Sequence, residues 1–310
     1  MIKRIIPLTL LLLWIAQTHC MAQRNFSDSE VTKLVMLGTG NPNPSPEQSG
    51  CALALIVNDT PYIVDFGPGL IRKAASLTSQ YGGPLEKLEI HELKTAFLTH
   101  LHSDHTIGYP DLIFTPWVMG RDLPLSVYGP TGIASMTNHI LEAYGEDIRY
   151  RVYGTEPTND QGWRVNCYEF DREGEIYRDS NITVEAFQVT HGTWPNAWGY
   201  RFTTPDKVIV ISGDCMPSEK VVEYAKDADI LVHEVYSKAG FDARPEEWRA
   251  YHAAHHTSTL ELAEIASRAR PGKVVLYHIL FWGHSEQELL EEIRSGYKGE
   301  VIVGQDLDIF

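Results

Sequence analysis

Four side chains that can bind a metal ion crowd into six consecutive residues: His100, Leu101, His102, Ser103, Asp104 and His105. An apolar run typical of a buried strand precedes them. In an extended chain the first two imidazoles point to the same side, and a turn at the serine brings the aspartate and the last histidine back toward them. Imidazole and carboxylate are preferred ligands of zinc and its first-row relatives. The segment therefore predicts a metal site rather than a polar strand end.

Further residues of the same types follow apolar segments in the second half of the chain. They are His191, Asp214, His233 and His278. A carboxylate at the tip of a buried strand is costly unless it is paired or bound to a metal, so Asp214 is expected to serve a metal. Strands that each end in a ligand are the expected construction of a site along one sheet edge.

Two histidines are candidate proton donors. His256 precedes Ser258 and Glu261, which form a capping box, so 255–258 is predicted to open a helix. The field at a helix N-terminus lowers the pKa of an imidazole and favours anions, which makes His256 the first candidate. His233 is the second, oriented by its neighbour Glu234, although a packing role is an equal alternative.

The catalytic set predicted from the sequence is Asp104, His256 and His233. Two other histidines near the donor, His252 and His255, are expected on a solvated loop.

The composition indicates one large soluble domain. The chain has 310 residues, of which 43% are hydrophobic and 22% charged, and no linker divides it. The formal net charge of −15 argues against nucleic acid and anionic membranes as general partners. Three cysteines remain beyond the N-terminus, Cys51, Cys167 and Cys215, and they are expected mainly as small buried side chains, with one disulfide left open. Oligomeric state is not encoded in any pattern, and a homodimer is left open.

The N-terminus resembles an export signal. Lys3 and Arg4 precede an apolar stretch over 5–16, and Ala22 suits cleavage. We therefore expect a signal peptide at 1–22, a single domain over 23–310, and a periplasmic or secreted protein with no stable membrane span after cleavage. An uncleaved anchor is the alternative, and Cys20 raises a lipoprotein reading that the preceding residues disfavour.

Strand and helix patterns alternate through two comparable halves. A hairpin is predicted over 51–57 and 61–66, a helix over 132–144, an irregular surface insertion over 150–162 and a last helix from Ser285. This alternation favours an α/β fold of two mixed sheets face to face with helices outside. Asp65 ends the hairpin, where we expect it to cap the next helix, with support of a metal ligand as the alternative.

These residues together resemble the metallo-β-lactamase superfamily, in its branch of ribonuclease Z-like proteins and exported arylsulfatases. The resemblance covers nearly the whole mature chain, extends to 128–132 and 198–201, and implies an αββα sandwich. It also implies two zinc ions per chain. One is held by His100, His102 and His191, the other by Asp104, His105 and His278, and Asp214 bridges them. Mn²⁺ and Fe²⁺ accept the same ligands.

Such a pair of ions makes hydroxide available near neutral pH to attack an ester. Export, acidity and the short interval 192–213, where a tRNA-gripping arm is inserted in ribonuclease Z, favour a small anionic ester. We therefore expect a phosphodiesterase or arylsulfatase. The alternatives are a ribonuclease Z-type tRNA 3′-processing endonuclease, a lactonase or β-lactamase, and a non-catalytic metal-binding protein.

Four aromatic residues close to the ligands in sequence are open to two interpretations. They could form an apolar wall beside the site, although core packing has the better odds. They are Trp194, Trp198, Phe281 and Trp282.

Overall fold

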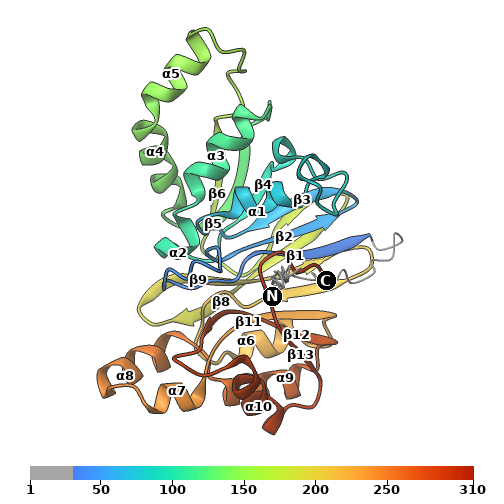
Figure 1. Cartoon of the computed structure of the whole chain (residues 1–310), viewed down its shortest axis with the longest axis vertical. Helices are drawn as coiled ribbons and strands as arrows, with labels where there is room; N and C mark the ends of the chain where they lie inside the picture. Colours follow the sequence, from blue (N-terminus) through green and yellow to red (C-terminus); the bar gives the residue numbers. More distant parts are fainter. Residues whose placement is uncertain (1–30) are drawn as a thin grey trace, which may run out of the picture. The chain divides into compact units, whose positions relative to one another are not determined.

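The computed structural model describes residues 31–310, which form one compact unit. The predicted signal peptide over 1–22 therefore lies outside the described residues. Two mixed β-sheets carry helices on their outer faces, as predicted (Figure 1). In the described part of the chain, no helix is both long and apolar enough to cross a membrane.

The first sheet has six strands in the order β1-β2-β3-β4-β5-β6. The first three run antiparallel and the last three extend the sheet in parallel from β3. Asn58 and Asp59 turn the predicted hairpin with φ of 48° and 64°, the left-handed pair that a tight hairpin turn requires. The strands are β1 (Thr32–Gly38), β2 (Ala52–Val57), β3 (Thr60–Val64), β4 (Thr95–Phe97), β5 (Leu125–Pro130) and β6 (Val165–Phe170).

The second sheet has seven strands in the order β13-β12-β11-β10-β9-β8-β7. Strands β10 to β13 are parallel, and β7 to β10 are antiparallel. Two of its strands, β7 and β9, were not anticipated from the sequence. The strands are β7 (Gly174–Arg178), β8 (Thr183–His191), β9 (Trp194–Thr203), β10 (Val208–Ile211), β11 (Ile230–Tyr236), β12 (Lys273–Leu280) and β13 (Glu300–Val303).

The helices flank the sheets in two sets, the first set beside the first sheet and the second beside the other (Figure 1). The first set is α1 (Leu70–Ser76), α2 (Ser103–Thr106), α3 (Tyr109–Val118), α4 (Ile133–Ala143) and α5 (Gly145–Tyr153), with short 3₁₀ turns η1 (Ser79–Tyr81) and η2 (Ile90–Glu92). The second set is α6 (Glu219–Tyr224), α7 (Lys238–Asp242), α8 (Glu246–His255), α9 (Thr259–Ala269) and α10 (Glu286–Gly296).

Local capping chemistry explains where two helices begin. Ser258 and Glu261 form the predicted capping box of α9, and Ser285 forms the matching box of α10. Two loop predictions were wrong. Helix α5 extends to Tyr153 inside the expected insertion, and His252 and His255 lie on helix α8 rather than on a solvated loop.

The main core fills the space between the sheets. Phe97 of the first sheet packs edge-on against Phe202 of the second, with ring centroids 5.6 Å apart. Trp198 is buried in this cluster against Phe170, so core packing is the correct interpretation for that tryptophan. The three described cysteines form no disulfide. The strands that lead to the ligand-type residues are thus fixed in two apolar, packed sheets.

Arg121 is a fully buried cation that ties the end of α3 to neighbouring loops. Its guanidinium donates hydrogen bonds to four backbone carbonyls and, within residues 31–310, to no carboxylate; the acceptors are Leu93, Leu112, Ile113 and Gly162. Burial lowers the pKa of Arg121 to about 10, which leaves it charged at neutral pH.

The variant Arg121→Met should lower the free energy of unfolding by about 3 kcal/mol or more, because it strands buried carbonyls without donors. Urea denaturation of the purified protein measures this loss. The exposed Arg72→Met is the control and should change stability by less than about 0.5 kcal/mol. Equal urea midpoints of unfolding for Arg121→Met and Arg72→Met would show that the buried guanidinium contributes nothing to stability.

Candidate metal centre

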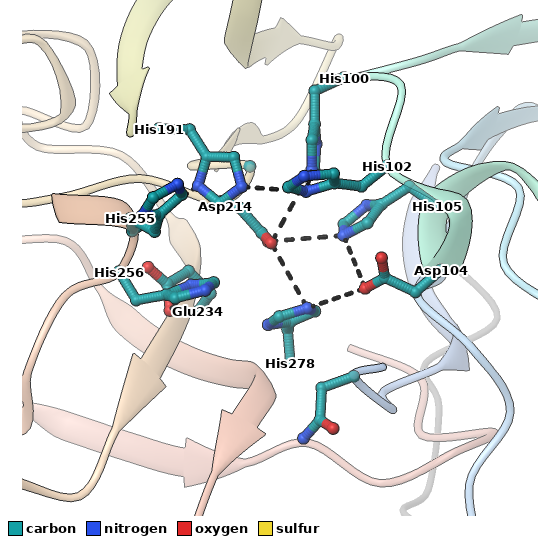
Figure 2. A network of polar contacts seen from close by, with 12 residues as sticks. His100, His102, Asp104, His105, His191, Asp214, Glu234, His255, His256 and His278 are labelled. Carbon is teal, nitrogen blue, oxygen red and sulfur yellow. Dashed lines mark hydrogen bonds and ion pairs between the residues drawn. The ribbon is translucent and has the colours of Figure 1, made fainter. Parts of the chain in front are cut away.

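Seven ligand-type side chains converge where strand ends of both sheets meet (Figure 2). The first sheet supplies the residues that follow β4, and α2 begins among them. The second sheet supplies one residue each from β8, from the loop after β10 and from β12. The set is His100, His102, Asp104, His105, His191, Asp214 and His278.

Three imidazoles form one part of the cluster. His102 Nδ1 lies 2.9 Å from His100 Nε2 and 3.1 Å from His191 Nε2. One ligand atom from each of these rings and from Asp214 lies within 4.8 Å of the others. Nitrogen atoms that converge in this way are the arrangement of ligands around one cation.

A carboxylate and two imidazoles form the other part. Asp104 Oδ2 lies 3.1 Å from His278 Nε2 and 3.5 Å from His105 Nε2. His278 adopts φ 47° at a break in the pairing of β12 with β11. Such a bulge re-aims a side chain, and here it directs the imidazole toward the carboxylates.

Asp214 lies between the two parts. One carboxylate oxygen is 3.5 Å from His105 Nε2, and the other is 3.4 Å from His278 Nε2 and 3.9 Å from His100 Nε2. Gly213 precedes it with φ 62°, a conformation that favours glycine and turns the chain sharply after β10. A carboxylate placed in this way can serve both parts of the cluster.

The pKa directions suit metal binding in the first part. Burial lowers the pKa of His100 well below its ordinary value and that of His191 to about 4, so both rings are neutral, the form that binds metals. Burial also opposes charge on His105, but facing anionic groups raise its pKa well above the ordinary value. Burial opposes charge on Asp214 as well, yet His278 and His105 hold its pKa well below the ordinary range.

Unsatisfied polar atoms test whether these residues fit a cation. His105 Nε2 and Asp214 Oδ1 are buried and form no hydrogen bond with the described residues. The ring nitrogens that face away from the centre do have partners. His105 Nδ1 lies 2.8 Å from Asp65 Oδ2, and His191 Nδ1 lies 2.7 Å from the His255 carbonyl oxygen. His105, whose Nδ1 is held by Asp65 while its Nε2 has no hydrogen-bond partner among the described residues, together with the unpartnered Asp214 oxygen, fits a divalent cation at the centre.

Asp65 supports the ligand cluster, a role that ranked second to helix capping on sequence grounds. The expected helix cap is wrong, because Gly69 occupies the N-cap of α1 and no side chain caps it. Asp65 instead accepts hydrogen bonds from the Thr99 N–H at 2.8 Å and the Thr99 hydroxyl at 3.0 Å, besides its contact with His105. Its position at a strand end was the available signal.

His256 lies at the edge of the cluster beside a buried carboxyl. Its Nδ1 is 3.4 Å from Glu234 Oε2, and Glu234 Oε1 accepts the Thr257 N–H at 2.9 Å. Burial is the largest influence on both groups: it raises the pKa of Glu234 well above the ordinary value and lowers that of His256 to about 4. His256 is the C-cap of α8 and lies two residues before Ser258, the N-cap of α9.

His233 precedes Glu234 on β11, so the two side chains point to opposite faces. His233 Nδ1 lies 2.6 Å from the Glu234 carbonyl. Among residues 31–310, no hydrogen bond or ion pair joins His233 to the ligand cluster. The structure therefore brings His256, and not His233, to the ligands.

The four aromatic residues near the ligands in sequence do not all share one role. Trp194 stands beside His102, with ring centroids 4.7 Å apart, whereas Trp198 belongs to the core. Trp282 lies against His252 of α8 at 4.6 Å.

Comparison with known families supports the architecture. Residues 60–279 match the family model described as a β-lactamase superfamily domain. A ribonuclease Z from Mycobacterium sp. (strain KMS) is 31% identical over 280 residues, which cover 89% of this chain and 94% of that protein.

Two solved structures share the fold. The metallo-β-lactamase fold protein YhfI of Bacillus subtilis superposes with a TM-score of 0.67 at 18% identity, covering 91% of this chain and 99% of that one. Human tRNase Z, short form, superposes with a TM-score of 0.66 at 20% identity, and the match covers 90% of this chain and 98% of that one.

The variant Asp65→Asn should weaken metal binding roughly 10- to 100-fold, because an amide cannot accept all the hydrogen bonds that hold His105 and Thr99. Competition with a chromophoric zinc chelator measures the affinity. Asp122→Asn, at an exposed site, is the matched control. Unchanged affinity in a folded Asp65→Asn protein would remove Asp65 from the site.

Proposed function

The chain belongs to the metallo-β-lactamase superfamily, and on this premise we propose that it is a ribonuclease Z-like endonuclease that cleaves the 3′ side of precursor tRNA. It is a metal-dependent hydrolase that acts on ester bonds. The observation that carries the substrate proposal is the 31% identity to a ribonuclease Z of nearly the same length.

The expectation of a small phosphate or sulfate ester was wrong, and so was the exclusion of nucleic acid. Ribonuclease Z proteins from several mycobacteria align with 89% of this chain and are themselves covered to 94–96%. The short interval 192–213 therefore does not separate this chain from ribonuclease Z proteins, because the two align over nearly their full lengths. Net charge misled because it averages the whole surface, whereas an enzyme meets RNA over one face.

We propose that the seven clustered residues hold two zinc ions, with Asp214 shared between them. The neutral imidazoles, the carboxylates and the supporting contact from Asp65 suit zinc. When bound, such ions supply Lewis acidity toward a phosphoryl group and lower the pKa of water. The chain supplies the fixed geometry, since the ligands lie on strands β8 and β12, on helix α2 and in the segments that directly follow β4 and β10.

We propose that His256 delivers a proton to the leaving ribose oxygen. Glu234 Oε2 lies 3.4 Å from His256 Nδ1, and burial raises the pKa of that carboxyl well above its ordinary value. A buried acid behind the imidazole can orient it and resupply its proton.

Wild-type protein loaded with zinc should cut a precursor tRNA that carries a 3′ trailer at one position. Asp214→Ala should slow this cut by roughly three orders of magnitude, since several kcal/mol of charge stabilisation are lost. Gel analysis of end-labelled RNA measures both rates, with the exposed Asp122→Ala as the matched control. Turnover of an aryl sulfate without any RNA cleavage would overturn the proposal.

The His256 proposal has a separate test. His256→Ala should slow cleavage of the natural linkage about 100-fold or more, because an alkoxide leaving group needs a proton. The same variant should cleave a linkage with sulfur as the leaving atom at nearly the wild-type rate, since a thiolate leaves without one. His139→Ala, at a surface site, serves as control. Equal slowing on both linkages would exclude proton donation.

We also propose, from the N-terminal sequence pattern alone, that the protein is exported. If residues 1–22 are removed during export, the RNA that the enzyme meets lies outside the cytoplasm. Cell fractionation with N-terminal sequencing of the isolated protein decides between a mature start near Gln23 and an uncleaved chain.

A further inference from the structure

Helix α8 presents a row of ring side chains beside the metal centre. Trp248, Tyr251 and His255 occupy positions i, i+3 and i+7 of the helix and therefore share one face. The indole of Trp248 lies 5.9 Å from the Tyr251 ring, and the Tyr251 ring stacks on His255 at 4.1 Å. We call these three residues the α8 ring row.

The ring row ends at the metal ligands. The His255 ring lies 5.0 Å from the His191 ring, and the His255 carbonyl faces His191 Nδ1 at 2.7 Å. A Cβ atom at Gly192 would fall 1.8 Å from His255 Nε2, so the ring is seated against the backbone next to His191. Figure 2 shows His255 beside His191 at one side of the cluster. The rings thus extend outward from the centre without a gap.

The outer two rings are left uncovered by the described chain. Trp248 is 46% exposed and Tyr251 is 42% exposed, although aromatic side chains at helical spacing are more often buried. Their supports are nevertheless fixed: His252 stacks beneath Trp248 at 5.8 Å and itself lies against Trp282. Rigid, exposed rings next to a reaction centre are a binding surface rather than a packing surface.

The charges near this row favour stacking over ionic attraction. Arg244 lies over the rings of Trp248 and Trp282, and Glu246 and Glu247 occupy the first turn of the helix. Arg249 follows Trp248 on the same helix, so two cationic side chains balance the two carboxylates near the row. Stacking on aromatic rings tolerates any base, because every base has a π-face.

We propose that the α8 ring row is a subsite for unpaired nucleobases, on which the nucleotides flanking the cleaved phosphodiester stack. This inference rests on the proposed function, which supplies RNA as the substrate. The row fixes the register of a single-stranded segment relative to the metal centre. Trp248 and Tyr251 act as positioning residues and touch no reacting atom.

The test combines changes in the protein and in the RNA. Precursor tRNA is prepared in an intact form and in a form with abasic nucleotides on both sides of the cleaved linkage. The double variant Trp248→Ala/Tyr251→Ala is compared with wild type on each. Tyr150→Ala/Tyr153→Ala is the matched control, because these exposed tyrosines share the i, i+3 spacing on α5.

Wild type should lose roughly ten-fold or more in kcat/KM when the bases are removed, and the α8 double variant should lose as much on intact RNA. On abasic RNA the α8 double variant and wild type should be equal, which also shows that the variant is folded and metal-loaded. Trp248→Phe/Tyr251→Phe should restore cleavage of intact RNA, and the α5 control should match wild type throughout.

Equal rates of wild type and the α8 double variant on intact RNA would overturn the ring-row proposal and leave the proposed function standing. So would equal losses of that variant on both RNAs, which mark a merely structural role. Absence of RNA cleavage by wild type would overturn the proposed function, and the ring row as an RNA subsite with it.

Discussion

The structure depends on a convergence of polar atoms that cannot be stable alone. Buried imidazoles and carboxylates from both sheets face one centre, and inner atoms such as His105 Nε2 and Asp214 Oδ1 find no hydrogen-bond partner among the described residues. Burying such groups costs several kcal/mol unless something compensates them. The divalent metal that the fold family implies would provide that compensation and would thereby couple the two sheets through the site.

Rigid apolar strands make this arrangement possible. The core between the sheets fixes the strand ends, and local devices then aim each ligand: a bulge at His278, a glycine turn before Asp214 and the carboxylate of Asp65 behind His105. Two of these devices, Gly213 and Asp65, lie outside the ligand set, and the third is the backbone of a ligand residue itself. The chemistry of the centre is therefore distributed through the fold.

The clustering of the seven ligand-type residues could be predicted from the sequence because they follow apolar strand patterns, and the capping boxes of α9 and α10 could be predicted from local spacing. Helix α8 could not be predicted, because the face formed by Trp248, Tyr251 and His255 is partly exposed to solvent and lacks the usual pattern of buried apolar residues. The role of Asp65 depends on a contact with Thr99, 34 residues away, which no local pattern encodes. The expected small ester was a wrong prediction because net charge averages the whole surface, and because the short interval 192–213 does not set this chain apart from ribonuclease Z proteins that align with 89% of it.

The central claim is that the clustered residues hold two divalent ions that drive RNA cleavage. Titration of zinc into metal-free protein, with bound metal counted by native mass spectrometry and cleavage of precursor tRNA followed in the same samples, tests it most directly. The account predicts two ions per chain and cleavage that rises with filling of the second site. Retention of full cleavage by metal-free protein, or saturation at a single ion, would contradict it.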